Sequence, residues 1–324
     1  MPAAVRRISP NVRRTLPYAT GALAGYAADA RFGDPRRGHP VAGFGRAAGR
    51  AEQALWRDHR GAGSLYTALC VGTVAGAALA ADRVAGRGRV MLTAAAVWTV
   101  LGGTSLTREA RLIDSALRAG DLTAARERLP HLCGRDPRSL DEQQIARAVV
   151  ESVAENTADA VVNALVWGAL AGTPGLLAFR AVNTLDAMVG HRSERYRRFG
   201  WASARLDDVA GWPGARLTAL LTVAAAPSPR TAWRIWRRDG SAHPSPNAGQ
   251  AESAFAGALG VRLGGTLRYG SRVEERPVLG AELPAVAVDD IERACALSRR
   301  VGLLALGVTV AGRFAVSALR RGRI

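Results

Sequence analysis

The highest density of acidic, amide and arginine side chains lies in residues 151–216, at the two ends of an apolar stretch. Glu151, Glu155 and Asp159 follow one another at intervals of four residues, which on a helix places three carboxyl groups on one stripe. The stripe runs into an apolar segment, where charges are costly unless they bind something. These acids are therefore candidates for binding a divalent metal ion. The plain alternative is a helix salt bridge between Glu151 and Arg147.

A second group of polar residues flanks a basic turn at residues 192–198. In chain order it contains Asn183, Asp186, Arg205, Asp207, Asp208 and Arg216. Carboxylates beside arginines suit a divalent metal that carries a phosphorylated ligand. For Asp208 a simpler role is also open, because its side chain could cap a helix that starts near residue 209.

Further polar candidates stand in turns outside this region. Asp34 and His39 lie in the segment 29–46, whose Gly-Asp-Pro and His-Pro sequences form turns, and the segment could equally be a plain surface loop. Arg135 lies in an Arg-Asp-Pro turn. Asn247 follows a proline-rich turn and can cap the helix after it.

The composition favours membrane helices and excludes several kinds of site. Hydrophobic residues make up 48% and charged residues 22% of the 324 residues, and the richness in Gly and Ala suits closely packed helices in a bilayer. All 44 basic residues are arginine, so neither a P-loop lysine nor a Schiff-base lysine is available. Cys70, Cys133 and Cys295 form no CxxC pair, which argues against a zinc site or a disulfide framework.

The net charge of +17 indicates a basic surface that could meet nucleic acid, anionic lipid or an acidic substrate. The chain has no basic motif with interleaved aromatic residues, so we expect no nucleic-acid partner. A lipid bilayer is the expected surrounding, and the cell membrane the expected location.

Apolar runs long enough to cross a bilayer separate the polar segments. They cover residues 64–81, 90–106, 160–182 and 301–319, with weaker or shorter runs at 17–30 and 217–226. We predict an all-α, multi-pass integral membrane protein with about four to five apolar spans. We expect residues 1–16 to be a disordered basic arm and residues 17–324 to form a single membrane-embedded catalytic domain.

The sequence Thr173-Pro174-Gly175 divides the run 160–182 into halves that are each too short to cross a bilayer. We interpret the run as a re-entrant hairpin, which would bring Glu155 and Asp186 to the same membrane face. The alternative is one kinked spanning helix.

Three more local predictions follow from the pattern. The runs 64–81 and 90–106, joined by a short basic turn, predict a helical hairpin. Ser139 or Asp141 is expected to cap the helix that carries Glu151. Residues 266–290 are expected to be a loop.

The motifs, in this order and spacing, resemble the cobalamin-biosynthesis family CobD/CbiB, the adenosylcobinamide-phosphate synthases. The resemblance covers about residues 20–320. The motifs that carry it are GDPRRGHPV (33–41), GRDPRSLD (134–141), ESVAENTAD (151–159), NTLDAMVG (183–190), ARLDDV (204–209), SPNAG (245–249), AGALGVRLGG (256–265) and RPVLG (276–280). The chain has Ala160, Ala164 and His191 where the family commonly has Gly, Pro and Tyr, and these departures remove no carboxylate and no arginine.

The resemblance implies a reaction. Adenosylcobyric acid would be joined through an amide to (R)-1-aminopropan-2-ol or its O-phosphate, with consumption of ATP. Because a carboxylate does not react with an amine at neutral pH unless it is activated, ATP would supply an acyl phosphate, with Mg²⁺ and arginines stabilising the transferring phosphoryl group. A complex with other enzymes of corrinoid synthesis is a further possible partner.

Roles for the candidate residues combine this reaction with their chemistry. Mg²⁺ ligands are expected among Glu151, Glu155, Asp159, Asp207 and Asp208, with the last three assigned to the metal. Catalytic roles go to Glu151, Glu155, Asp186 and His39. Substrate or phosphate binding is assigned to Asp34, Arg135, Asn156, Asn183, Arg205, Arg216 and Asn247.

Other functions stay open at this point. Intramembrane acids beside a broken helix also suit a transporter, although the polar motifs cluster between the spans and no inverted repeat is visible. A non-catalytic membrane scaffold for a corrinoid-assembling complex is another reading. A prenyl-diphosphate transferase is less favoured, because Asp207-Asp208 has no second spaced aspartate motif.

Overall fold

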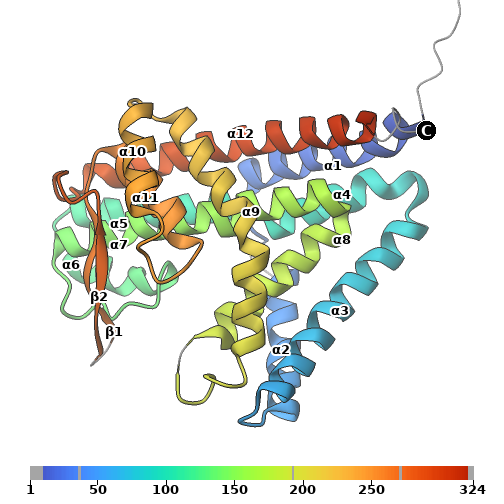
Figure 1. Cartoon of the computed structure of the whole chain (residues 1–324), viewed down its shortest axis with the longest axis horizontal. Coiled ribbons are helices and arrows are strands. Elements are labelled where there is room, and N and C mark those ends of the chain that lie inside the picture. The colour runs from blue at the N-terminus through green and yellow to red at the C-terminus, as the bar shows by residue number, and fades with distance from the viewer. Residues whose placement is uncertain (1–9, 36–37, 192, 270–271, 320–324) are drawn as a thin grey trace, which may run out of the picture.

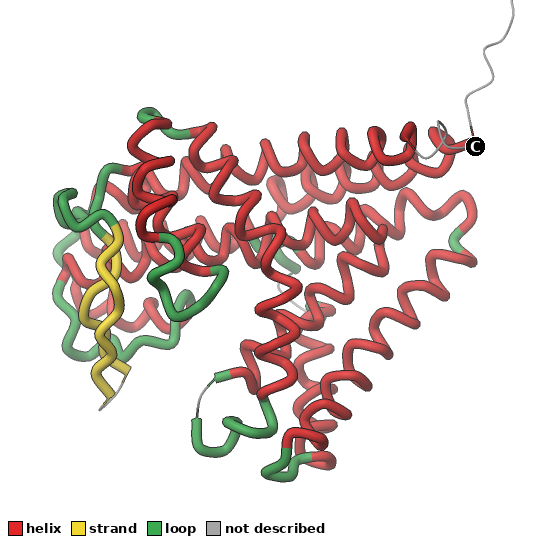
Figure 2. Tube along the Cα trace, viewed as in Figure 1, coloured by secondary structure: helices red, strands yellow, loops and turns green. Residues whose placement is uncertain are grey.

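The computed structural model describes residues 10–35, 38–191, 193–269 and 272–319, which form a helical molecule with a small two-stranded sheet (Figures 1 and 2). In chain order the elements are α1 Pro10–Phe32, α2 Pro40–Leu55, α3 Arg60–Val84, η1 Gly86–Gly88, α4 Arg89–Val100, α5 Gly103–Arg118, α6 Leu122–Arg128, η2 Leu129–His131, α7 Glu142–Asn156, η3 Thr157–Val162, α8 Asn163–Leu185, η4 Asp186–Gly190, α9 Trp201–Ala225, α10 Pro229–Asp239, α11 Ala248–Leu259, β1 Leu263–Tyr269, β2 Arg272–Leu279 and α12 Asp289–Leu319.

Four of the described helical segments are long and apolar enough to cross a membrane. They are Arg60–Val84, Gly86–Arg118, Glu142–Gly190 and Asp289–Ala315. Along α3 the side chains of Leu65, Leu69 and Leu79 are 52%, 50% and 40% exposed, which suits contact with lipid rather than water. The prediction of an all-α, multi-pass membrane protein is confirmed.

Helices α1 and α4 pack closely because α1 carries glycines at its contact face. A Cβ added at Gly21 would lie 2.6 Å from Thr93 Cβ, and one at Gly25 would lie 2.7 Å from Val97 Cβ. Small residues four positions apart let two helix backbones approach in this way. Helix α1 begins at Pro10, so residues 10–16 are helical, and residues 1–9 of the expected disordered arm lie outside the described residues.

The predicted hairpin of two neighbouring spans is wrong. Helix α3 packs mainly against α8 and α9, whereas α4 packs mainly against α1, and the two helices diverge in Figure 1. The predicted second span is also interrupted, because α4 ends at Val100 and α5 begins at Gly103. The close fit of α4 on the glycines of α1 explains why it does not lie along α3.

Asp141 is the residue that caps α7. Its carboxylate accepts a hydrogen bond from Gln144 N at 2.8 Å, and the Gln144 side chain accepts one from Asp141 N at 3.0 Å. This reciprocal capping box fixes the start of the helix that carries Glu151 and Glu155. Of the two caps that the sequence allowed, Ser139 and Asp141, the structure therefore selects Asp141.

The helical path from α7 to η4 folds back on itself within α8. Gly172 has φ 70° and ψ −161°, a conformation that interrupts the helix one residue before Thr173-Pro174-Gly175. The carboxyl groups of Glu155 and Asp186, 31 residues apart, interact electrostatically, which a straight helix of that length would prevent. The chain therefore has the hairpin form that the break predicted, with both acids at its open end.

Strands β1 and β2 correct the prediction of a loop from residue 266 onward. They pair antiparallel, with a register shift between Leu263 and Gly265, where Gly264 of β1 faces two residues of β2, Pro277 and Val278. Arg147 of α7 donates hydrogen bonds to Gly264 O at 2.6 Å and Thr266 O at 2.8 Å, which fastens β1 to α7. Glycines and charged residues give a weak strand signal, so the pairing depends on this tertiary anchor.

Candidate active site

Two π-helical turns carry the acids nearest the centre of the site. Asp159 lies in η3, which directly continues α7, and Asp186 is the first residue of η4, at the end of α8. A π turn adds a residue to the helix and redirects the side chains around it, and such turns are frequent at functional sites. At η4 a Cβ on Gly190 would collide with the Asp186 carboxylate, so glycine is needed there.

Asp159, Asp186 and Asp207 form what we call the aspartate group. Burial, followed by the charge of Asp186 and then the charges of Asp208 and Glu155, raises the pKa of Asp207 to about 7, against the lowering effect of Asn183. The Asn183 amide donates to Asp207 Oδ1 at 3.5 Å. The charge of Asp159 interacts with Asp207, Glu155 and Asp186. Like charges from three segments therefore converge.

Few side chains neutralise or hydrogen-bond the carboxylates of the aspartate group. Within the described part of the chain, neither Asp159 nor Asp186 forms a salt bridge or accepts a side-chain hydrogen bond. Arg180 interacts electrostatically with Asp159 and is itself buried in α8. Clustered carboxylates with so little positive charge nearby favour a bound cation.

Asp208, Arg216 and Asn247 are brought together at the edge of this group. Asn247 Nδ2 donates to the backbone oxygen of Asp208 at 2.8 Å, and Arg216 Nη1 donates to Asn247 Oδ1 at 2.9 Å. The Arg216 guanidinium also lies over the Trp212 ring, 4.7 Å from its centroid. The Asp208 carboxylate faces Arg205 Nη1 at 3.3 Å on the exposed side of α9.

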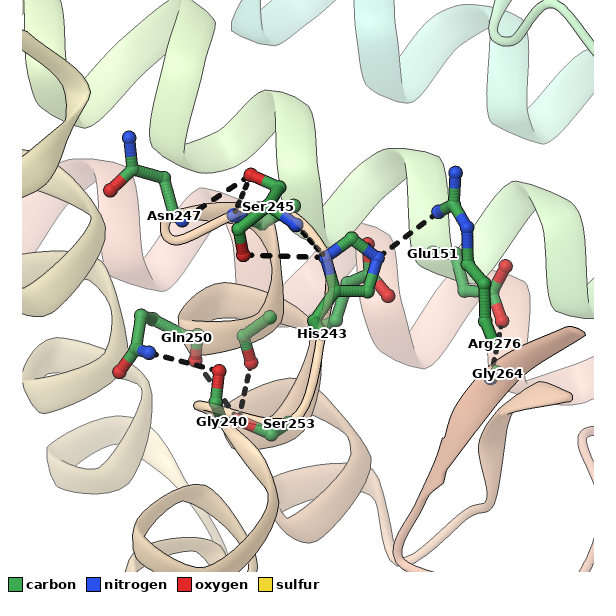
Figure 3. A network of polar contacts seen from close by, with 12 residues as sticks. Glu151, Gly240, His243, Ser245, Asn247, Gln250, Ser253, Gly264 and Arg276 are labelled. Carbon is green, nitrogen blue, oxygen red and sulfur yellow. Dashed lines mark hydrogen bonds and ion pairs between the residues drawn. The ribbon is translucent and has the colours of Figure 1, made fainter. Parts of the chain in front are cut away.

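A second cluster, which we call the arginine–glutamate network, contains Arg135, Glu151, His243, Glu252 and Arg276. Figure 3 labels Glu151, His243 and Arg276 of this network. Glu151 forms a buried salt bridge with Arg135 and accepts a hydrogen bond from Gly264 N at 2.7 Å. Gly264 lies at the register shift between the two strands, opposite the extra residue of β2. The carboxylate of Glu151 is therefore held by partners from two distant segments.

His243 joins the turn before α11 to strand β2 in this network. Its Nε2 lies 3.1 Å from Arg276 Nη1 and 3.9 Å from Glu252 Oε1. On its other side, His243 Nδ1 accepts a hydrogen bond from Ser245 N at 3.0 Å and lies 3.4 Å from Ser245 O. Burial raises the pKa of Glu252 well above its ordinary range, and the charges of Glu151 and Glu155 add to this effect.

Glu155 lies between the two clusters and is exposed. On one side its charge interacts with Arg276, Arg135 and Glu151, and on the other side it acts on Asp186 and Asp207. The neighbouring Asn156 donates its amide to Ser152 O at 2.9 Å within the same helix. Glu155 is thus the acid best placed to meet a ligand that touches both clusters.

Asp34 and His39 lie in a separate cavity of about 340 Å³ between α2, α4 and α8, which Arg180 and Met188 also line. His39 Nδ1 accepts a hydrogen bond from Val41 N at 3.2 Å and caps α2. One carboxylate oxygen of Asp34 is buried without a partner in the described residues. Arg180 interacts with both Asp34 and Asp159, so this cavity is connected electrostatically to the aspartate group.

Sequence reasoning overlooked four residues at the site: Arg180, His243, Glu252 and Arg276. An arginine inside an otherwise apolar run was an available signal for Arg180, since such residues are rarely placed in a membrane without a role. His243, Glu252 and Arg276 lie in or beside the motifs SPNAG (245–249) and RPVLG (276–280), but their partners are far away in sequence.

No set of three or more His, Cys, Asp or Glu side chains among the described residues is arranged to hold a metal ion by itself. Mg²⁺ commonly binds through one or two carboxylates and takes its other ligands from water and substrate phosphates. The oxygen donors of the aspartate group suit that mode. The assignment of Asp159, Asp207 and Asp208 as metal ligands stays a prediction.

Comparison with known proteins gives the family. The family model "CobD/Cbib protein" matches residues 22–298. The chain belongs to the CobD/CbiB family. Cobalamin biosynthesis protein CobD of Mycobacterium tuberculosis H37Rv is 55% identical over 289 residues, covering 87% of this chain and 92% of the relative. No solved structure matches the chain.

More distant CobD relatives match over a similar extent. CobD of Geobacter metallireducens is 46% identical over 79% of this chain and 84% of its own length. CobD of Chromobacterium violaceum is 40% identical over 90% of this chain and 95% of its own length. Membership of the CobD/CbiB family supports a role in cobalamin biosynthesis, and the matched region contains both clusters described above.

Proposed function

We propose that this CobD/CbiB protein is a membrane-embedded ligase that joins adenosylcobyric acid to (R)-1-aminopropan-2-ol or its O-phosphate, using ATP. The observation that carries the proposal is the aspartate group, in which like charges from η3, η4 and α9 converge beside exposed Glu155. A cluster of this kind is suited to a magnesium-bound nucleotide. The family supplies the expected corrinoid acid.

One or two carboxylates of the aspartate group, Asp207 among them, would hold Mg²⁺ through oxygen atoms, and water and the phosphates of ATP would supply its other ligands. When bound, the ion would neutralise charge on the phosphates of ATP during transfer. Arg216, which Asn247 and Trp212 hold in place, is the arginine best positioned beside this group to contact a phosphate. Asn183 would orient Asp207.

The proposed chemistry has two steps. An oxygen of the substrate carboxylate attacks the γ-phosphorus of ATP, which forms an acyl phosphate and releases ADP. The amine nitrogen then attacks the acyl carbon, the bond to phosphate breaks, and the nitrogen loses a proton as the amide forms. Glu155 is the proposed proton acceptor, because Glu151 is already occupied by Arg135 and Gly264 N.

The test uses the full chain purified in detergent with adenosylcobyric acid, MgATP and either free or phosphorylated aminopropanol. Mass spectrometry should detect the amide, with one ADP released for each amide formed. Omission of the corrinoid acid should stop ADP release. Complementation of a strain blocked between cobyric acid and cobinamide gives a second readout. ATP turnover without amide, or corrinoid uptake into vesicles without amide, would overturn the proposal in favour of another membrane function.

A further inference from the structure

A cavity of about 540 Å³ lies outside both clusters, among α1, α5, η3 and α12. Its volume falls in the range of pockets that hold small ligands. Its lining includes Tyr26, Asp29, Thr104, Arg108, Val161 and Arg299. The mixture of one buried acid with several arginines is unusual enough to require an explanation.

Asp29 provides an unsatisfied negative group in this cavity. The residue is 4% exposed, and its Oδ2 accepts hydrogen bonds from Thr104 N at 3.3 Å and Thr104 Oγ1 at 3.1 Å. Its Oδ1 is buried and has no hydrogen-bond partner in the part of the chain that the structure describes. A buried carboxylate oxygen without a donor is costly, so a ligand that donates hydrogen bonds would be stabilised here.

The arginines of the cavity provide positive charge that the protein only partly balances. Arg111 is bound by Glu292 at 2.6 and 2.9 Å, and Arg299 Nη2 lies farther from the same carboxylate, at 3.6 Å. Arg108 forms no hydrogen bond or ion pair with any described residue. The lining of the cavity thus contains three arginines and one carboxylate, Asp29, while Glu292 and Asp114 outside the lining offset part of the charge of Arg111.

We propose that this cavity binds a small phosphorylated amine, with its ammonium group on Asp29 and its phosphate on Arg108 and Arg299. A phosphate monoester carries a charge of about −1.5 to −2 near neutral pH, so together with one ammonium group it offsets the excess of the arginines. A simple anion would leave the Asp29 oxygen unsatisfied, and a simple cation would add to the positive charge. The zwitterion satisfies both.

The cavity adjoins the aspartate group through η3. Val161 lines the cavity and lies two residues after Asp159, so the two side chains leave the same π-helical turn in different directions. A Cβ added at Gly103 would lie 3.2 Å from Val161 and 3.6 Å from Asp29, which shows how closely α5 approaches both. Resting on the proposed function, the ligand is the phosphorylated amino alcohol that supplies the amine. A phosphoethanolamine lipid headgroup shares its chemistry.

The experiment measures binding to the delipidated full chain in detergent by isothermal titration calorimetry. The probes are (R)-1-aminopropan-2-ol O-phosphate, free (R)-1-aminopropan-2-ol and inorganic phosphate. The phosphorylated amine should bind at least tenfold more tightly than either fragment. Asp29→Asn and Arg108→Gln should each weaken it tenfold or more, whereas Arg87→Gln, at an exposed arginine that does not line the cavity, should not. Unchanged thermal unfolding shows that each variant is folded.

A second set of measurements, with added lipids, distinguishes the free phosphorylated amine from a lipid headgroup of the same chemistry. Reconstitution with phosphatidylethanolamine should leave binding of the soluble phosphoamine unchanged relative to phosphatidylglycerol if the free compound is the ligand. Competition by phosphatidylethanolamine that is lost in Asp29→Asn would instead identify a lipid headgroup at the same site. Undiminished affinity in both variants would overturn the cavity assignment, even if amide synthesis is observed. Binding that depends on Asp29 and Arg108 without amide synthesis would support the cavity and reject the proposed reaction.

Discussion

The aspartate group and the arginine–glutamate network adjoin the same helical path, α7 and η3, and both are built from segments far apart in sequence. In the network, Glu151 has the guanidinium of Arg135 and the backbone N–H of Gly264 as partners, with Arg147 Nε farther away at 4.0 Å. In the aspartate group, Asp207 has one amide at 3.5 Å and faces other acids.

The two clusters therefore differ in what their buried charges do for the protein. Removing one partner of a compensated buried pair leaves the other charge unpaired and destabilises the fold. Removing one of several like charges relieves repulsion, so its cost is expected in ligand binding and catalysis. The network should therefore behave as part of the fold, and the aspartate group as a site that a ligand completes.

The largest effect should come from breaking the network. We expect Arg135→Met to lower the free energy of unfolding by about 3–5 kcal/mol, because Glu151 would stay buried with only the long contact to Arg147 Nε, at 4.0 Å, as a charged partner. Thermal unfolding in detergent measures the change. The matched control is Arg138→Met, three residues later, whose salt bridge with Asp136 is 82% exposed on the arginine side. The control should cost at most about 1 kcal/mol. Equal losses would show that the network is not a structural unit.

The next effect should be on activity alone. Asp207→Asn should reduce amide synthesis by about 100-fold or more, equal to about 2.7 kcal/mol of transition-state stabilisation, while the unfolding temperature stays equal or rises. The asparagine keeps the shape and removes one of the repelling charges. Asp58→Asn, at an exposed ion pair with Arg198, serves as the control and should retain activity. If Asp207→Asn strongly destabilises the protein, Asp207 stabilises the fold as the network does, and the distinction between the two clusters is wrong.

A smaller effect should appear in the pH dependence of stability without Mg²⁺. The pKa of Asp207 is about 7 in the folded protein and the ordinary value is 3.8, so between these values the folded state holds a proton that the unfolded state has released. Stability should therefore fall as pH rises through this window, by at most about 1.4 kcal/mol per pH unit. Asp207→Asn should flatten the curve of unfolding temperature against pH. A wild-type curve that rises over the same window would contradict the placement of Asp207 among like charges.

The smallest effect concerns the rim of the aspartate group. Arg205→Gln removes an ion pair in which the arginine is 67% exposed, so the free energy of unfolding should change by less than about 1 kcal/mol. The apparent affinity for MgATP should change less than it does in Arg216→Gln, because Arg216 is held by Asn247. Steady-state kinetics with varied MgATP compares the two. A larger effect of Arg205→Gln would move the phosphate contact to the exposed face of α9.

Several features of the protein could be predicted from residues close together in the chain. The capping box of Asp141 and Gln144 sets the start of α7, and the Gly-Pro-rich break near Gly172 sets the reversal in α8. The apolar runs predicted a multi-pass membrane protein, and the ordered motifs predicted the family. Each of these depends on helix geometry or on local composition, which the sequence displays directly.

Only the tertiary structure decided which acidic side chains have a positively charged partner. Glu151 and Asp159 belong to one stripe of carboxylates in the sequence, yet Glu151 meets Arg135 and the backbone N–H of Gly264, 113 residues away, whereas Asp159 meets Asp186 and Asp207. The strands were missed for a similar reason, since β1 is anchored by Arg147. Burial and Coulomb interactions depend on distances through space, so the same carboxyl group can serve the fold or a ligand according to what folding places beside it.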